Sequence, residues 1–144
     1  MRMPLPSLLG ALLLTACQPA PDSANVTVEQ ARVTLPAVQG RPGAAYFVIE
    51  SSTDARLTGL TSARAQRIEL HDSSAGRMRP LEDSRIPEGE RIKFAPGGRH
   101  AMIFGLDPAL KVGDRLALTF NFDGSPPVTA EAEVQGPGGS HDSH

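Results

Sequence analysis

Short runs of alternating apolar and polar residues follow one another along this chain. A period of two is typical of strands with one buried face. The clearest run covers 44–50, and the first run is interrupted between 26–28 and 33–35, which predicts a strand with a bend. Further strands are predicted at 57–60, 67–71, 91–94, 101–104, 115–122 and 128–134.

Glycine, proline and aspartate separate these runs, at 87–89, 96–98, 112–114 and 123–124. Such residues are typical of tight turns. No window of helical length keeps a 3.6-residue period, and only Leu106 to Leu110 is expected to form one short helical turn. Seven to nine short strands at this spacing predict an all-β fold, a Greek-key sandwich or barrel, in a single domain.

The N-terminus has the features of a secretory signal. Arg2 precedes an apolar run from Leu5 to Leu14, and small residues lead to Cys17. The run is too short for a mature transmembrane helix. A cysteine directly after Leu14-Thr15-Ala16 resembles the bacterial lipobox, in which the thiol is acylated and becomes the new N-terminus. The alternative is an ordinary signal with an incidental cysteine.

These features divide the chain into four parts. We expect a lipoprotein signal at 1–16, the lipidated Cys17 with a linker at 17–25, a folded domain at 26–135 and a flexible tail at 136–144. The predicted location is the bacterial cell envelope, on the periplasmic side and held to the membrane by lipid. Gln18, in place of an aspartate, slightly favours the outer membrane.

Composition narrows the classes of partner. Without Arg2 the chain has 13 basic and 16 acidic residues, so its formal net charge is −3. This balance gives no reason to expect nucleic acid as a partner. There is no tryptophan and only one tyrosine, so stacking platforms for bases or sugars are not expected.

Beyond the signal, the chain keeps two methionines, and each lies near a histidine. Met102 closes a His-x-Met triplet with His100, and Met78 follows His71 by seven residues. Thioether sulfur and imidazole without thiolate suit Cu(I) better than zinc, magnesium or calcium. Cys17 is the only cysteine, which excludes a blue-copper electron carrier, whose site needs a thiolate.

Strand phase places both histidines on a polar face. If Ile68 and Leu70 face the core, Glu69 and His71 face outward, and His100 shares a face with Met102. The alternative is an exposed histidine at a strand end and a methionine that covers a loop. The placement of both methionines of the expected mature chain near a histidine, in a secreted chain without a free cysteine, favours the copper site.

At this point the residues resemble a known family, the periplasmic PCuAC-type copper chaperones. Their pattern is a histidine, a methionine and, after twenty-one intervening residues, a His-x-Met pair. Residues 79–99 give this spacing between Met78 and His100. The resemblance covers roughly residues 26 to 134. It includes the segments Glu69-Leu70-His71, Met78-Arg79-Pro80 and Pro96-Gly97-Gly98-Arg99-His100-Ala101-Met102, and a glycine pair at 105 and 113.

The resemblance implies a cupredoxin-like β-sandwich that binds one Cu(I) through His71, Met78, His100 and Met102. It also implies copper delivery to the dinuclear centre of cytochrome c oxidase, through oxidase subunit II or a thioredoxin-like assembly factor. The family usually has ten or so residues between its first histidine and the methionine. This chain has only 72–77, so we expect a shorter hairpin there.

Two further features extend the copper hypothesis. His141 and His144 in the tail resemble the histidine-rich tails of some family members, and would form a secondary site that could take Cu(II); a tail without function is the alternative. Arg77, Arg79 and Arg99 flank the predicted ligands and are candidates for docking an acidic partner. The alternative is that they only solubilise exposed loops.

Three other functions are alternatives: a non-metal lipoprotein adaptor, a copper-sequestering resistance protein and a hydrolase. The hydrolase is the weakest, because Asp72, Ser73 and Ser74 are adjacent to His71 on one loop and cannot take the spatial roles of a catalytic triad. No nucleophile elbow, zinc-protease motif or phosphate loop is present. We therefore expect a protein that is not an enzyme.

Overall fold

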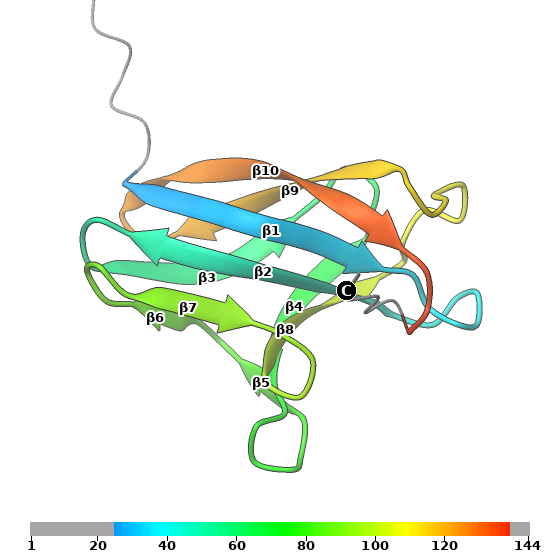
Figure 1. Cartoon of the computed structure of the whole chain (residues 1–144), viewed down its shortest axis with the longest axis horizontal. Coiled ribbons are helices and arrows are strands. Elements are labelled where there is room, and N and C mark those ends of the chain that lie inside the picture. Colours follow the sequence, from blue (N-terminus) through cyan, green and yellow to red (C-terminus); the bar gives the residue numbers. More distant parts are fainter. Residues whose placement is uncertain (1–24, 139–144) are drawn as a thin grey trace, which may run out of the picture.

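A computed structural model describes residues 25–138. Ten strands form one continuous sheet that curls over itself, and these residues contain no helix (Figure 1). The strands are β1 (Val26–Thr34), β2 (Gly43–Ser51), β3 (Ala55–Thr61), β4 (Arg67–Asp72), β5 (Arg79–Leu81), β6 (Ser84–Ile86), β7 (Arg91–Phe94), β8 (Arg99–Phe104), β9 (Arg115–Phe122) and β10 (Ser125–Gln135). The predicted all-β class is confirmed.

The order of strands in the sheet is β5-β4-β8-β2-β1-β10-β9-β3-β6, and β7 also pairs with β2. β1 and β10 run parallel, and the other pairs are antiparallel. In Figure 1, β2, β1 and β10 lie in front of β3 and β4, so the sheet encloses a core like a flattened barrel.

The core is apolar and contains three phenylalanines from different strands. Phe47 stacks on Phe94 with ring centroids 4.3 Å apart, and Phe120 meets Phe47 edge-on at 4.8 Å. Offset and edge-on arrangements are favoured because the rings carry opposite charge on face and edge. Leu57, Ile86, Ile103 and Leu118 are fully buried around them. This cluster joins both layers and fixes the positions of the strands.

The bend predicted in the first strand is confirmed. The register of β1 against β2 shifts between Glu29 and Arg32, and Gln30 between them has a φ of 53°. A β-bulge of this kind lets one long strand follow the curvature of a barrel.

One expectation from the sequence is wrong, and two short strands of the structure were not expected. The segment 106–110 is not a helical turn; it is a tight turn in which the Leu110 N–H donates to the Asp107 carbonyl at 3.1 Å. The Asp107 side chain also accepts from the Ala109 N–H at 2.9 Å, a local bond that favours a turn over helix. The short strands β5 and β6 were not predicted.

β8 begins at a large excursion of the chain. On β2, Phe47 pairs with Phe94 of β7 and Ala45 pairs with Ala101 of β8, so the two β2 residues have only Tyr46 between them. Their partners Phe94 and Ala101 are separated by residues 95–100, which leave the sheet and return to it. The excursion is closed by the Ala95 N–H bond to the Arg99 carbonyl at 2.8 Å. His100 therefore lies at the point where β8 rejoins the sheet.

No helix of residues 25–138 has the length and apolar character needed to cross a membrane. The signal at 1–16, Cys17 and the tail histidines His141 and His144 lie outside the described residues.

Candidate copper site

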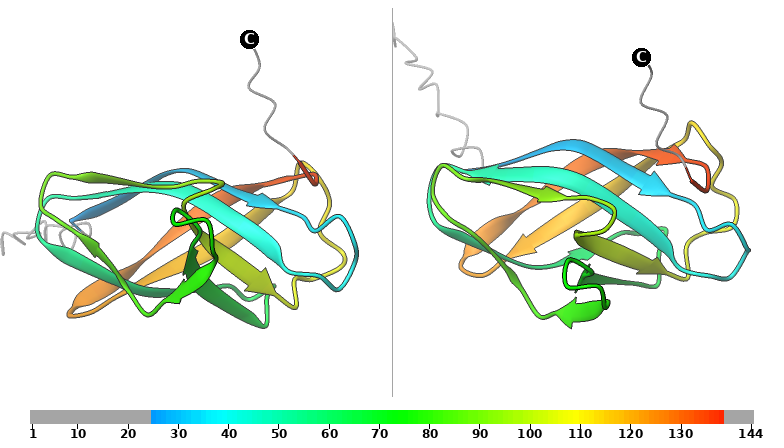
Figure 2. Two further views of the ribbon diagram at one scale, coloured as in Figure 1. Left: turned by 90° about the horizontal axis from the view of Figure 1, so that it is seen from below. Right: turned by 60° about the horizontal axis from the view of Figure 1, so that its bottom comes forward.

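β4 and β8 bring the two predicted histidines together. These strands pair antiparallel and lie side by side in the green and yellow-green part of the ribbon (Figure 2). Their register sets His71 directly opposite His100 and Glu69 opposite Met102. The histidine rings are roughly parallel, with centroids 6.0 Å apart. Residues that are 29 positions apart in the chain thus become neighbours, because strand pairing, unlike sequence spacing, controls their separation.

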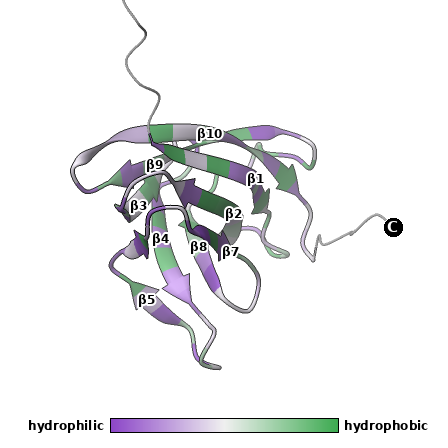
Figure 3. Ribbon diagram, turned by 60° about the vertical axis from the view of Figure 1, so that its left-hand side comes forward, coloured by the Kyte–Doolittle hydropathy of each residue, from purple (hydrophilic) through white to green (hydrophobic). Residues whose placement is uncertain are grey.

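The predicted phase of both strands is confirmed. Leu70, Ala101 and Ile103 are buried on the core side. Their neighbours therefore point to the other face. Figure 3 shows hydrophilic residues where β4 ends and β8 begins. Met102 is half-buried, and the His71 side chain is only 12% exposed, so this histidine is more enclosed than a position on a polar face suggests.

The hairpin between β4 and β5 carries Met78. It is short, as expected: β4 ends at Asp72 and β5 begins at Arg79. In the register of these strands His71 faces Pro80, two residues after Met78. Two strand residues span about 7 Å. The hairpin therefore returns Met78 to the neighbourhood of His71, and in Figure 1 it projects below the body of the molecule. Met78 is 55% exposed.

Asp72 stabilises this hairpin. Its carboxylate accepts a hydrogen bond from the Ser74 N–H at 2.8 Å and contacts the Arg79 guanidinium at 3.5 Å. Hydrogen bonds from the Ser74 side chain and backbone, with the nearby Arg79, hold the pKa of Asp72 below its ordinary value. The Ser73 N–H donates to the Gly98 carbonyl at 3.1 Å, which ties the hairpin to the excursion before His100.

Each histidine has one ring nitrogen in contact with a neighbouring oxygen. His100 Nδ1 lies 2.9 Å from the Gly98 carbonyl oxygen, and His71 Nε2 lies 3.3 Å from a Glu69 carboxylate oxygen. Among residues 25–138, His71 Nδ1 is a buried side-chain nitrogen with no hydrogen-bond partner. A buried polar atom without a partner is rare in folded proteins and calls for an explanation. A metal ligand is one such explanation.

The donor set fits copper better than a harder ion. No group of three or more His, Cys, Asp or Glu side chains in the described part of the chain is arranged to hold a metal ion. Carboxylate-rich sites, which suit calcium and magnesium, are therefore not formed by these residues. The other candidate donors are the two imidazoles and the thioethers of Met78 and Met102, a set of ligand types that suits Cu(I).

The three arginines proposed for docking differ in their exposure and in the direction of their side chains. Arg77 is exposed on the hairpin, and Arg79 is exposed beside Asp72. Arg99 directly precedes His100 on β8, so the two side chains point to opposite faces of the strand. The Arg99 guanidinium donates a hydrogen bond to the hydroxyl of the buried Ser84 at 3.2 Å. Arg99 is therefore held away from the face that carries His100 and Met102.

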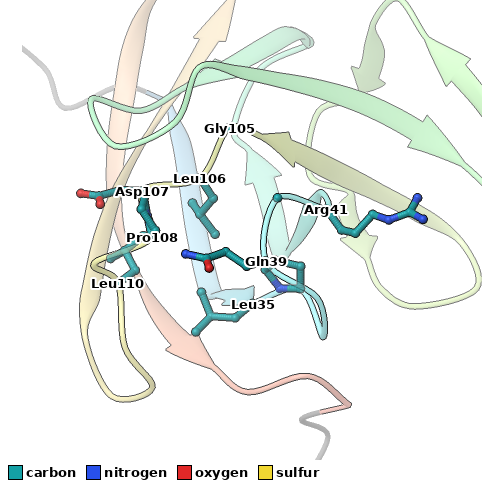
Figure 4. A pocket seen from close by; sticks show the side chains of 10 residues that line it. Leu35, Gln39, Arg41, Gly105, Leu106, Asp107, Pro108 and Leu110 are labelled. Atoms are coloured by element: carbon teal, nitrogen blue, oxygen red, sulfur yellow. The ribbon is translucent and has the colours of Figure 1, made fainter.

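A hollow elsewhere in the molecule does not contain the predicted ligands. Residues from the β1–β2 loop and the β8–β9 connection line it, with Gln39 amid Leu35, Leu106, Pro108 and Leu110 (Figure 4). Its volume is about 220 Å³. None of the four candidate copper ligands lines this hollow.

The fold is that of known copper-binding domains. The copper-bound PCuAC domain from PmoF2 matches with a TM-score of 0.68 at 22% identity, over 79% of this chain and 95% of that domain. Apo-DR1885 from Deinococcus radiodurans matches with a TM-score of 0.62 at 23% identity, over 94% of this chain and 95% of that chain. The Cu(I) form of DR1885 gives 0.61 at 21% identity, over 83% of each chain. The predicted cupredoxin-like fold of PCuAC domains is confirmed.

The sequence itself defines the family. Residues 26–134 match the family described as "Putative lipoprotein LpqE-like", and the chain belongs to this LpqE-like family. A curated relative, "Putative lipoprotein Lxx21020" from Leifsonia xyli subsp. xyli, is 36% identical over 80 residues, which are 51% of this chain and 48% of that protein. The matched segment thus spans about half the length of this relative. Both descriptions name lipoproteins.

Proposed function

We propose that this protein is a copper chaperone of the cell envelope, which binds one Cu(I) through His71, Met78, His100 and Met102 and passes it to another protein. One observation carries the proposal: His71 and His100 lie opposite each other on β4 and β8, with Met102 two residues along the same strand face. The likeness of the fold to PCuAC domains, including copper-bound ones, supports it.

The proposed ligands suit transfer as well as binding. The histidines come from paired strands inside a rigid sheet, whereas Met78 comes from an exposed hairpin. In this arrangement an incoming ligand from an acceptor can replace the Met78 thioether while the strand ligands still hold the ion. Thioether and imidazole also form no disulfides, which suits an oxidising compartment.

Lipid on Cys17 would hold the domain at the membrane, with residues 17–25 as a linker. The lipoprotein names of the family and of the curated relative support an anchored envelope protein. We place it on the periplasmic side, with the outer membrane slightly favoured. The recipient is the dinuclear copper centre of cytochrome c oxidase, in subunit II, reached directly or through a thioredoxin-like assembly factor.

A Cu(I) titration against a competing chelator tests the binding. We expect one tightly bound ion in the parent protein and strongly weakened binding in His100→Ala and His71→Ala. The matched control is the double variant His141→Ala, His144→Ala, which removes two imidazoles from the tail and leaves the proposed site unchanged. A parent protein that does not compete for Cu(I) would refute the proposal and favour the non-metal adaptor.

Transfer separates a chaperone from a copper-sequestering protein. The Cu(I)-loaded protein is mixed with the soluble copper domain of oxidase subunit II, and the copper content of each is measured after separation. A chaperone gives up its ion to the acceptor faster than free chelator removes it. Retention of copper in the presence of the acceptor would contradict the delivery role.

A further inference from the structure

We propose that Glu69 is a positioning residue that holds His71 as its Nε2–H tautomer, so that His71 binds copper through Nδ1 whereas His100 binds it through Nε2. This inference rests on the proposed function, because it concerns the same site. It adds a residue outside the four ligands and assigns the donor atom of each histidine.

The chemistry of the two acceptors determines where the ring protons lie. An ionised carboxylate can only accept hydrogen bonds, and so can a backbone carbonyl. The 3.3 Å contact of His71 Nε2 with Glu69 therefore requires a proton on Nε2. The 2.9 Å contact of His100 Nδ1 with the Gly98 carbonyl requires a proton on Nδ1. In a neutral imidazole the other nitrogen then carries the free lone pair.

The remaining nitrogen of His71 is the one without a partner. Nδ1 is buried, and no hydrogen-bond donor reaches it within the described residues. As a bare acceptor it loses its hydration on folding without a hydrogen bond in return, which destabilises the copper-free protein. A cation that accepts its lone pair would remove this cost. The Glu69 contact sets the tautomer, and the atom without a partner is the nitrogen that this tautomer leaves with a free lone pair.

Glu69 is itself held in place by a series of contacts along the outer face of β4 and β8. Its second carboxylate oxygen forms a 2.6 Å ion pair with the Arg67 guanidinium. That guanidinium lies over the Phe104 ring, 4.3 Å from its centroid. A cation over an aromatic face is attracted to it electrostatically. Phe104 pairs with Arg67 across the strands, so the series ends on the rigid sheet.

Outer partners of this kind orient a metal-binding histidine and fix its tautomer, and their removal commonly weakens metal binding by about 10–100-fold. We expect Glu69→Ala to lower the Cu(I) affinity within that range. Glu69→Gln keeps a carbonyl oxygen that can accept from Nε2–H, so it should retain more of the affinity. Glu131→Ala, which removes an exposed carboxylate on β10, is the control for net charge.

The decisive measurement needs no copper. Long-range ¹H–¹⁵N NMR correlations of the histidine rings in the copper-free protein report which nitrogen carries the proton, with assignments from His71→Ala and His100→Ala. We expect the Nε2–H form for His71 and the Nδ1–H form for His100. In Glu69→Ala the His71 signals should change to a mixture of tautomers, whereas Glu69→Gln and Glu131→Ala should keep the parent pattern.

The outcomes separate this inference from the proposed function. A parent protein that binds Cu(I) but shows His71 as the Nδ1–H form would overturn the inference and leave the chaperone proposal intact. Unchanged tautomer and affinity in Glu69→Ala would also overturn it. A parent that shows the expected tautomers but binds no Cu(I) would refute the chaperone proposal and the copper-binding half of the inference, while the positioning of His71 by Glu69 would stand.

Discussion

At the scale of single residues, the two methionines differ most in their surroundings. Met102 is half-buried on a paired strand, and Met78 is 55% exposed on a hairpin. Leucine is close to methionine in volume, and such exchanges cost less than about 1.5 kcal/mol in a core. Substitution by leucine therefore removes a sulfur ligand with little effect on packing.

We expect Met102→Leu and Met78→Leu each to weaken Cu(I) binding while the unfolding temperature changes little. Chelator competition measures the affinity, and thermal denaturation of the copper-free protein measures the fold. Val112→Leu, at a 66% exposed position between β8 and β9, is the control. Parent-like Cu(I) affinity in both methionine variants would exclude them as ligands.

Asp107 links a turn to the adjoining loop. Its carboxylate accepts from the Ala109 N–H and pairs with Arg64 at 3.0 Å, and these contacts, the Ala109 bond foremost, hold the pKa of Asp107 below its ordinary value. A carboxyl whose pKa is depressed by folding stabilises the protein above the unfolded pKa and loses this contribution as pH falls through the folded value.

Asp107→Asn should therefore reduce stability near pH 7 and make the unfolding free energy less dependent on pH below about 4, where aspartate titrates in unfolded chains. Urea denaturation at several pH values measures both effects. Asp123→Asn, at the exposed turn between β9 and β10, serves for comparison. An identical acid response in the parent and Asp107→Asn would rule out this contribution.

At the scale of elements, the long strands were predictable and the short ones were not. β2 and β9 carry sustained apolar patterns that fix both their type and their buried face. β5 and β6 have three residues each, and β5 contains Pro80. They become strands because β4 and β3 offer them free edges to pair with, and such pairing leaves no periodic signal in three residues.

Two strand glycines test how tightly these elements approach each other. A Cβ on Gly43 would lie 2.8 Å from the Thr34 carbonyl oxygen, a backbone atom of β1 that cannot move aside alone. A Cβ on Gly59 would meet nothing within 4 Å. Neither glycine has a positive φ, so only the available space distinguishes them.

Gly43→Ala should thus destabilise the protein by about 1–3 kcal/mol, the usual cost of overpacking. Gly59→Ala should be neutral or slightly stabilising, because alanine has less freedom to lose on folding. Chemical denaturation measures the pair under the same conditions. Equal stability of the two variants would show that β1 and β2 can separate without cost.

At the scale of the whole molecule, the proposed copper site lies at one edge of the sheet, where the β4–β5 hairpin projects from the body. An acceptor can approach this edge without displacing the core. Of the three arginines predicted to dock it, Arg77 is exposed there, and Arg79 is exposed although it contacts Asp72 at 3.5 Å. Arg99 is less exposed and is bonded to Ser84. The docking hypothesis is therefore restricted to Arg77 and Arg79.

If Arg77 and Arg79 steer an acidic acceptor, the double Arg→Glu variant should slow copper transfer at low ionic strength. Steering acts on the association rate more than on affinity and fades with salt, since the screening length is about 10 Å at 0.1 M. Lys111→Glu, on an exposed loop before β9, is the single-site control for charge reversal. Equal transfer rates for parent and double variant at low salt would remove these arginines from docking.

The sequence by itself determined the all-β class, the phase of the strands around the predicted ligands and the short hairpin before Met78. These features depend on local periodicity and spacing, which a single chain displays directly. It also indicated soft copper ligands from residue chemistry alone. Their assignment as ligands stays a prediction until copper binding is measured.

Only the tertiary structure decided that His71 and His100 face each other, that Arg99 turns to the core side and that Arg67, Glu69 and His71 form one connected series. Each depends on the register between strands distant in sequence. A shift of one residue would invert every side chain of a strand, and the register is held by the buried phenylalanines and aliphatic residues of the whole core.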